Sequence, residues 1–217
     1  MTTDTTVLDG LDFTAFGRGP GLAVADDVAD LLFREARTAA AFTPDEVSDE
    51  QIAAVYDLVK WGPTALNTVP LRLLVVRTPE ARQRLAAHMS EGNRERVLGA
   101  PVSLVLAADT GFHTHIPTLA PHMAALADSL AGQPEQRESM ARTNALIQAG
   151  YLIVGLRAAG LAAGPMGGMD ADAIDSEFFA DNGWKSLLVV NVGHVDGAGT
   201  HRPRAERLGY AQASLTV

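Results

Sequence analysis

One stretch of the chain limits the possible folds more than any other: a helical pattern that runs from about Glu135 to Leu161. Its apolar residues recur at helical spacing, and in its second half they surround the helix almost completely. Gly150 and Gly155 lie within it and allow another backbone to approach closely. Because no apolar run is long enough to span a bilayer, we expect a central helix that the rest of a folded domain surrounds.

Three apolar segments of strand length supply the other half of the predicted core, at residues 71–77, 102–107 and 185–193. Shorter helical patterns cover residues 26–36, 48–60, 94–99 and 171–178, and another begins at Thr78-Pro79. Ser48-Asp-Glu-Gln51 is a capping box, and residues 164–168 predict the end of the long helix. This mixture predicts an α+β layer fold, with one domain over residues 26–217 after an irregular arm over residues 1–25.

Charge and composition exclude several classes of function. The 217 residues carry a formal net charge of −9, which disfavours a surface that binds nucleic acid or anionic membrane. The chain has no cysteine, so disulfides, thiolate nucleophiles, zinc–thiolate sites and iron–sulfur clusters are excluded. The first 25 residues lack the basic start and apolar stretch of a secretion signal, and we expect a cytoplasmic protein.

The familiar motifs of nucleophilic, metal and dinucleotide chemistry are missing from the sequence. His113-Thr-His115 brings two imidazoles together, but no acidic residue or third histidine follows at a spacing that metal sites use. There is no Gly-x-Ser-x-Gly elbow, and no Gly-x-Gly-x-x-Gly follows a strand. We therefore expect no metal site and no catalytic side chain of these kinds.

Five short polar segments lie between the apolar elements. They are Arg37-Thr38, residues 63–70, residues 93–96, residues 164–168, and Arg202-Pro-Arg204 with Arg207 nearby. Glycine lets a flat ligand approach the backbone, and a guanidinium group suits phosphate. Each segment alone is a weak signal, because terminal arginines are usually solvated and Gly-Pro-x-Gly-Gly is usually a turn.

The order and spacing of the five segments resemble the nitroreductase superfamily, the flavin-dependent fold of dimeric reductases. Within it they resemble the HadB/RutE subfamily, typified by malonic semialdehyde reductase of pyrimidine breakdown. The resemblance spans about Leu31 to Tyr210 and is carried by Lys60-Trp-Gly-Pro-Thr-Ala-Leu-Asn67, Tyr151-Leu-Ile-Val154, Gly164-Pro-Met-Gly-Gly-Met-Asp170 and Lys185-Ser186. It implies a small, mostly antiparallel central sheet flanked by helices, with the long buried helix at its centre.

The resemblance also implies an FMN site at the interface of a homodimer. At the phosphate end, Arg37 with Thr38 matches the first phosphate-binding segment, and Arg202 and Arg204 match a basic pair. Asn93 and Arg96 match residues that bind the ribityl and ring parts, and Asn144 falls where many members place a polar residue near the ring. The backbone of Pro165, Met166, Gly167 and Gly168 would lie against the flavin, and Thr64, Ala65 and Asn67 would reach it from the partner subunit.

The activity that this resemblance implies is ping-pong hydride transfer. NADH or NADPH reduces FMN and leaves, and a small acceptor then takes the hydride; the subfamily suggests malonic semialdehyde, reduced to 3-hydroxypropionate. Because the flavin carries the hydride chemistry, no catalytic side chain is obligatory. The alternatives are a broad nitroaromatic or quinone reductase, a flavin-binding protein without turnover, and a structural protein without a ligand.

Overall fold

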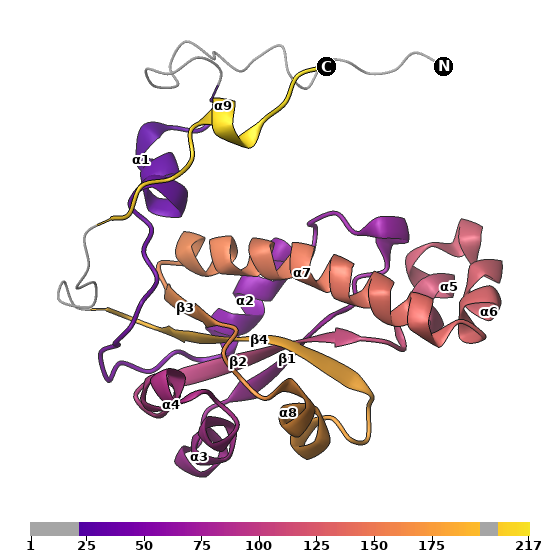
Figure 1. The fold of residues 1–217 in the computed structure, drawn as a ribbon, viewed down its shortest axis with the longest axis horizontal. Coiled ribbons are helices and arrows are strands. Elements are labelled where there is room, and N and C mark those ends of the chain that lie inside the picture. The colour runs from indigo at the N-terminus through magenta and orange to yellow at the C-terminus, as the bar shows by residue number, and fades with distance from the viewer. Residues whose placement is uncertain (1–21, 196–203) are drawn as a thin grey trace.

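A four-stranded antiparallel sheet forms the centre of the computed structural model, which describes residues 22–195 and 204–217 (Figure 1). Across the sheet the strands follow the order β1 (Leu71–Val76), β2 (Val102–Asp109), β4 (Trp184–Gly193) and β3 (Ala162–Met166). Each neighbouring pair runs antiparallel. The fold class expected from the sequence, with a small antiparallel sheet flanked by helices, is therefore confirmed.

The two edge strands differ from what the sequence predicts. Residues 164–168 were expected only to end the long helix, but Gly164 and Pro165 lie within β3. Proline is tolerated there because the outer side of an edge strand needs no backbone donor. The strand expected over residues 71–77 is present as β1, but the expectation that it is buried is wrong for its middle, since β1 is the opposite edge and Val75 is 38% exposed.

Strand β2 separates two hydrophobic cores. All of its residues are buried, and successive side chains point to opposite faces of the sheet. Leu104 and Leu106 pack in the core beneath α2 (Asp49–Val59) and α7 (Pro134–Ala158), and Val105 and Ala107 pack in the other core. Figure 1 shows α2 and α7 on one face of the sheet and α3 (Pro79–Ala87), α4 (Glu91–Leu98) and α8 (Ala171–Phe178) on the other.

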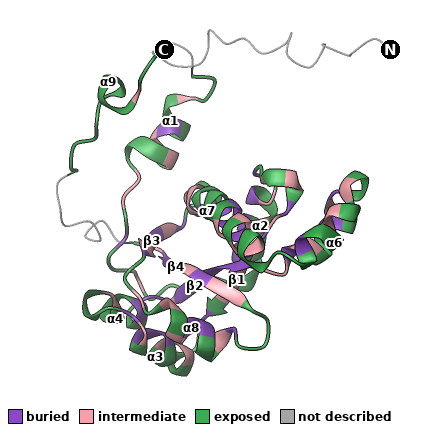
Figure 2. Cartoon of the chain, turned by 45° about the vertical axis from the view of Figure 1, so that its right-hand side comes forward, coloured by how far each residue is buried: buried purple, intermediate pink, exposed green. Residues whose placement is uncertain are grey.

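The long helix predicted from the apolar pattern is α7, but its burial is one-sided (Figure 2). Leu152 and Leu156 are fully buried, whereas Leu146, Ile147 and Tyr151 are 51%, 43% and 45% exposed. The prediction that the chain surrounds this helix on all sides is thus wrong for a single chain. In the single chain, the apolar residues on the open side of α7 are only partly covered by the residues described.

The remaining helices begin where capping residues predict. Ser48 and Gln51 form the expected capping box at α2, and the Thr78 hydroxyl accepts a hydrogen bond from the Ala81 N–H at the start of α3. Helix α4 begins three residues before the predicted position. The segment after β2 folds into η4 (Phe112–His115), α5 (Ile116–Leu119), η5 (Pro121–Met123) and α6 (Ala125–Ala131).

The ends of the described chain form α1 (Asp26–Ala29), η2 (Asp30–Arg34) and α9 (Tyr210–Ala213), so the helix expected over residues 26–36 ends at Arg34. Helices α1 and α9 stand away from the sheet (Figure 1), whereas η2 contacts α7, where Arg157 Nη1 donates a hydrogen bond to the Leu32 carbonyl oxygen at 3.1 Å. Most of the predicted N-terminal arm lies outside the described residues, and the assignment of residues 26–217 to one domain stays a prediction. None of the described helices is long and apolar enough to cross a membrane.

Candidate functional site

The first group of predicted site residues gathers along β3. The Ala39 N–H donates a hydrogen bond to the Ala163 carbonyl oxygen at 3.0 Å, which lays half-buried Arg37 and exposed Thr38 beside this strand. A Cβ at Gly164 would lie 2.5 Å from the Ala39 carbonyl oxygen. Only glycine therefore allows the Arg37 segment to approach the strand this closely.

The segment after β3 is joined to α4. The Gly168 carbonyl oxygen accepts hydrogen bonds from the Ser90 N–H and from the Asn93 side-chain amide, both at 3.0 Å. A Cβ at Gly168 would lie 2.6 Å from Ser90 Oγ, whereas a Cβ at Gly167 would meet nothing within 4 Å. Gly168 is thus required by packing within the chain, and the exposed backbone at Gly167 is open to a ligand. Pro165 is half-buried and Met166 is buried in the strand itself.

Two predicted arginines lie near this group, and a third cannot be placed. Arg204 is exposed, and its Nη2 donates a hydrogen bond to the Ala36 carbonyl oxygen at 3.0 Å, next to Arg37. The Arg96 side chain is exposed, and its carbonyl oxygen accepts a hydrogen bond from Asn191 Nδ2 at 2.8 Å. Arg202 lies outside the described residues. The structure therefore brings Arg204 to the Arg37 segment, as one phosphate-binding cluster requires.

The second group is the loop from Thr64 to Val69, between α2 and β1. Leu66, Asn67 and Val69 have positive φ angles of 57°, 53° and 40°. Positive φ is uncommon for residues other than glycine, and for a β-branched side chain such as valine it is a clear outlier. Strain of this kind is typical of functional loops, and it persists only where the surrounding structure holds it.

Hydrogen bonds from side chains hold this strained loop. Asn144 Oδ1 accepts from the Ala65 N–H at 2.6 Å, and Asn67 Nδ2 donates to the Leu119 carbonyl oxygen at 2.9 Å. The Thr64 hydroxyl accepts from the Val69 N–H at 3.2 Å. Asn144 is buried, and its amide also donates to the Met140 carbonyl oxygen at 2.9 Å. In the single chain both ends of the Asn144 side chain are therefore engaged: Oδ1 holds the loop, and the amide nitrogen is bound to the backbone of α7 itself.

Sequence reasoning missed two further residues, Arg72, which anchors the loop, and Gln148, which anchors the start of β1 after it. Arg72 Nη1 donates to the Val69 carbonyl oxygen at 2.9 Å, and Arg72 Nη2 forms an ion pair with Asp109 at 2.6 Å. Gln148 Oε1 accepts a hydrogen bond from the Leu71 N–H at 2.9 Å, where β1 begins. The available signal was that Asn144 and Gln148 lie four residues apart in an apolar helix, which places two amides on one face.

The two groups lie at opposite edges of the sheet, because β3 forms one edge and β1 the other. Three inter-strand spacings separate these edges, which amounts to roughly 14 Å. One chain alone therefore does not bring all the predicted residues together. The roles of these residues in binding a cofactor stay predictions.

Two titratable groups with shifted pKa values lie outside both groups. Burial lowers the pKa of His113, and the guanidinium of Arg137, whose Nη1 lies 3.3 Å from His113 Nε2, lowers it further. The pKa of Glu177 is lowered by hydrogen bonds from His88 and Arg84. The described residues contain no group of three or more side chains placed to hold a metal ion.

Comparison with known proteins decides the family. The sequence profile described as "Nitroreductase family" matches residues 34–194. The chain belongs to the nitroreductase family. The matched range includes both groups of predicted site residues except for the tail arginines.

Individual relatives and structures agree with this assignment. A Streptomyces coelicolor protein with the provisional name NADH dehydrogenase/NAD(P)H nitroreductase is 52% identical over 188 residues, which cover 87% of this chain and 95% of that protein. A nitroreductase structure from Exiguobacterium sibiricum in complex with FMN has a TM-score of 0.77 at 16% identity, and the match covers 89% of this chain and 99% of the other. A nitroreductase family structure from Streptococcus pneumoniae has a TM-score of 0.74 at 21% identity, over 86% and 98% of the two chains.

These findings confirm the predicted nitroreductase-like fold and the predicted enzyme class, a reductase of the nitroreductase family. They are also consistent with the predicted cofactors, since FMN is bound in the Exiguobacterium structure and NAD(P)H is part of the Streptomyces protein's name.

Proposed function

We propose that this protein is an FMN-dependent NAD(P)H oxidoreductase of the HadB/RutE subfamily, which transfers a hydride to a small 3-oxo acid such as malonic semialdehyde. The observation that carries the proposal is the family match over residues 34–194, together with a preformed, strained loop at Thr64–Val69, within the segment that carries the motif resemblance. When bound, FMN supplies the redox chemistry: it accepts a hydride from NAD(P)H and passes it to the acceptor.

The residues along β3 suit such a cofactor. Arg37 and Arg204 would bind the phosphate, and the open backbone at Gly167 would lie against the flat ring. Ala163, beside the Arg37 segment, and Gly167 are four residues apart along extended chain, which is roughly 13 Å. This spacing suits an elongated ligand with an anionic end and a planar end. Asn93, held at Gly168, would contact the cofactor near its ring end.

Phosphate binding by Arg204 can be tested with two flavins. Arg204→Ala removes charge-assisted hydrogen bonds worth roughly 1.5–3 kcal/mol, so FMN affinity should fall about 10- to 150-fold. Riboflavin has no phosphate and should bind the variant and the parent nearly alike. Titration of both flavins into apo-protein measures this, and an equal loss for the two flavins would show that Arg204 does not contact the phosphate.

The choice of acceptor rests on motif resemblance, and the names of the relatives favour a second candidate. Because the Streptomyces coelicolor relative is named as a nitroreductase, a nitroaromatic or quinone acceptor is the alternative. Steady-state oxidation of NADH and NADPH should be measured with malonic semialdehyde, a nitrofuran and a quinone. A higher kcat/KM for the aldehyde acid supports the proposal, and turnover of the nitrofuran or quinone alone contradicts it. Bound flavin without any turnover would indicate a flavin-binding protein.

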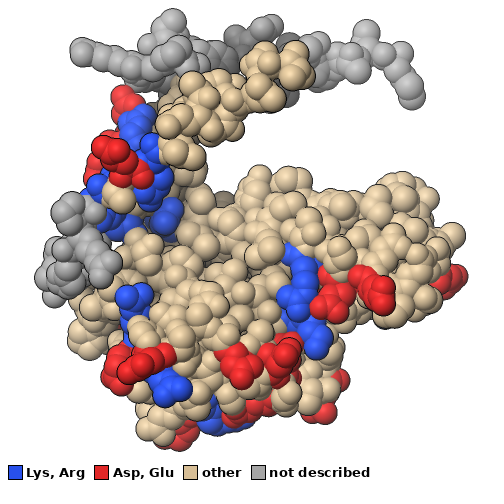
Figure 3. Space-filling model, in the orientation of Figure 1, with Lys and Arg blue, Asp and Glu red and all other residues tan. Residues whose placement is uncertain are grey.

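We also propose that the protein is a homodimer in which each FMN site is shared. Trp61 on the loop side of α2 is 82% exposed, and the open side of α7 carries Leu146, Ile147 and Tyr151. Figure 3 shows a broad uncharged surface over the C-terminal half of α7. Such apolar surface is typical of an obligate interface. A second chain docked there would bring its β3 group toward the strained loop, which lies at the other edge of this sheet.

Mixed dimers test whether sites are shared. Asn67→Ala and Arg204→Ala chains, carrying different affinity tags, should be co-expressed and the mixed dimer isolated. If each site combines the loop of one chain with the arginine of the other, the mixed dimer has one intact site and one site that carries both substitutions. The mixed dimer should then bind about half an equivalent of FMN tightly per chain. Two weakened sites of equal affinity would show that each site lies within one chain, and a monomer that binds FMN tightly would refute the dimer itself.

A further inference from the structure

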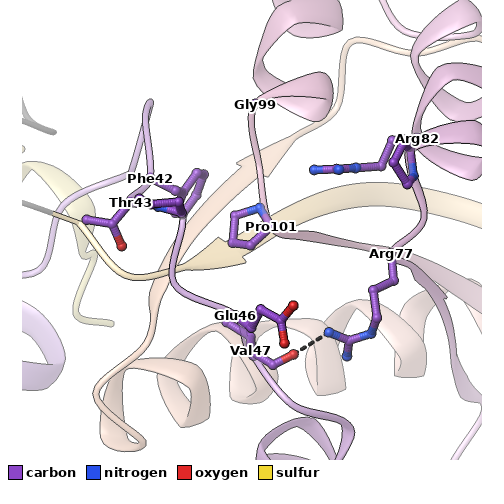
Figure 4. A pocket seen from close by; sticks show the side chains of 10 residues that line it. Phe42, Thr43, Glu46, Val47, Arg77, Arg82, Gly99 and Pro101 are labelled. Atoms are coloured by element: carbon purple, nitrogen blue, oxygen red, sulfur yellow. Dashed lines mark hydrogen bonds between the residues drawn. The ribbon is translucent and has the colours of Figure 1, made fainter.

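A cavity of about 600 Å³ lies away from both groups of predicted site residues, at the end of the sheet where β1 ends and β2 begins (Figure 4). Its walls come from the segment before α2, from Arg77 and the start of α3, and from the link between α4 and β2. Pockets for small molecules measure about 300–1,000 Å³, so this volume suits a small ligand. None of the residues expected to bind FMN lines this cavity.

Arg82 brings a positive charge into the cavity that no carboxylate balances. Its Nη1 donates hydrogen bonds to the carbonyl oxygens of Ala100 and, at 3.4 Å, Leu98, and its buried Nε has no partner. No carboxylate of residues 22–195 or 204–217 lies within ion-pair distance of it. The carbonyl contacts fix the orientation of the guanidinium, so an anion that enters the cavity would meet a positioned positive charge.

Arg77 has a different role in the same cavity. Its Nη2 forms an ion pair with Asp49 at 2.5 Å, and its Nη1 donates to the Val47 carbonyl oxygen. Figure 4 shows both guanidinium groups directed from the α3 side toward the segment that carries Thr43 and Glu46. Since Asp49 already balances Arg77, and exposed Glu46 is the one carboxylate in the lining, the cavity suits an anion with a single charge.

The opposite wall is apolar and already built. Phe42, Pro44 and Pro101 line it. A Cβ at Gly193 would lie 2.7 Å from Phe42 Cδ1 and 2.7 Å from Pro101 Cγ, so the glycine lets both rings pack against β4. A simple inorganic anion would leave this wall unused. A flat apolar body would cover it and gain the free energy of burying apolar surface.

We propose that this cavity binds a small aromatic carboxylate, with the carboxylate on the Arg82 guanidinium and the ring against Phe42 and Pro101. The site is separate from the FMN site, so binding leaves the flavin spectrum unchanged. The probe is 4-fluorobenzoate, titrated into the protein as purified and followed by fluorine NMR, with the flavin absorbance recorded in parallel. Saturable binding in the millimolar range or tighter, without a change in the flavin spectrum, is expected.

Matched variants assign this binding to the cavity. Arg82→Gln should weaken binding about 10- to 150-fold, the range expected for a lost charge-assisted hydrogen bond. Arg84→Gln makes the same change on the same helix outside the cavity and should leave the affinity unchanged. Glu46→Gln, at an exposed position, should tighten binding because it removes a like charge from the lining.

Neutral 4-fluorobenzamide keeps the proposal testable even if Arg82→Gln does not fold. It has the same shape as the acid without the charge, and it should bind at least about tenfold more weakly. Equal affinity for the acid and the amide would overturn the proposal. So would an absence of saturable binding, an unchanged affinity in Arg82→Gln, or binding that always accompanies a change in the flavin spectrum.

Discussion

Replacing Asn144 by alanine tests whether the strained loop depends on the side chains around it. Three loop residues have positive φ, at a cost of roughly 1–3 kcal/mol each. Four hydrogen bonds that involve side chains hold the loop. The side chains are those of Asn144, Asn67, Thr64 and Arg72, and each bond contributes roughly 0.5–1.5 kcal/mol. The strain sums to about 3–9 kcal/mol and the hydrogen bonds to about 2–6 kcal/mol, so these contacts offset much of the strain and losing one of them should shift the loop measurably.

Asn144→Ala removes the acceptor of the Ala65 N–H and should favour the open loop by about 1–3 kcal/mol. Hydrogen exchange measures this directly: the amides of residues 65–69 should exchange about 5- to 150-fold faster, while those of β2 stay protected. If the loop contacts FMN only when closed, FMN affinity should fall in step with the closed population.

Gln148→Ala is the matched control, because Gln148 is also a buried amide on α7 that accepts a backbone N–H, but from Leu71 rather than from the loop. Gln148→Ala should speed up hydrogen exchange of the amides at the start of β1, with a smaller effect on exchange at residues 65–69. Equal acceleration at every amide in Asn144→Ala would mean global destabilisation instead. Unchanged exchange in the loop would refute the idea that Asn144 holds it.

Three further predictions concern stability, pH and the flavin contact. Gly155→Ala places a Cβ 2.2 Å from Val59 Cγ1 and should lower the free energy of unfolding by about 1–3 kcal/mol in urea titrations, whereas Gly92→Ala, at an open helical position, should raise it slightly. Because folding lowers the pKa of His113, the unfolded state binds a proton at this histidine at a higher pH than the folded state does. The free energy of unfolding should therefore fall as the pH drops below 6.5 toward the lowered pKa. Urea midpoints compared across this pH range should show the fall in the parent protein and not in His113→Gln. Gly167→Ala should leave the melting temperature of apo-protein unchanged yet weaken FMN, whereas Gly168→Ala should lower that melting temperature because its Cβ meets Ser90 Oγ.

The sequence predicted those elements whose cause is local. The capping box at Ser48 and the helix start at Thr78 depend on residues three positions apart, and both are present in the structure. Strand β3 was missed because its only support is pairing with β4, far along the chain, which outweighs the poor strand propensity of Gly164 and Pro165. The one-sided burial of α7 was missed because an apolar pattern shows that a face needs cover without showing which chain supplies it.

The sequence also predicted only the local features of the candidate site. The polar segments were visible as short motifs, but the contacts of Arg72 with Val69 and Asp109 depend on how β1 pairs with β2. Nor does spacing along the chain reveal that the Arg37 segment and the loop lie at opposite edges of one sheet. Resemblance to a family supplied the residues, and only the three-dimensional arrangement separates them into two groups.

The strained loop and the exposed side of α7 are best understood together. A Cβ at Gly62, two residues before Thr64, would lie 3.0–3.2 Å from ring atoms of Tyr151, so the start of the loop packs directly on the open side of α7. Asn144, which holds the loop, and the exposed residues Ile147 and Tyr151 follow one another at helical spacings of three and four. A partner that covers these two apolar side chains would therefore necessarily lie beside the loop. Binding of that partner would then cover the apolar face of α7 and complete the site at the same time. This explains why the chain has both an exposed apolar helix face and a strained loop, although the single chain needs neither of them.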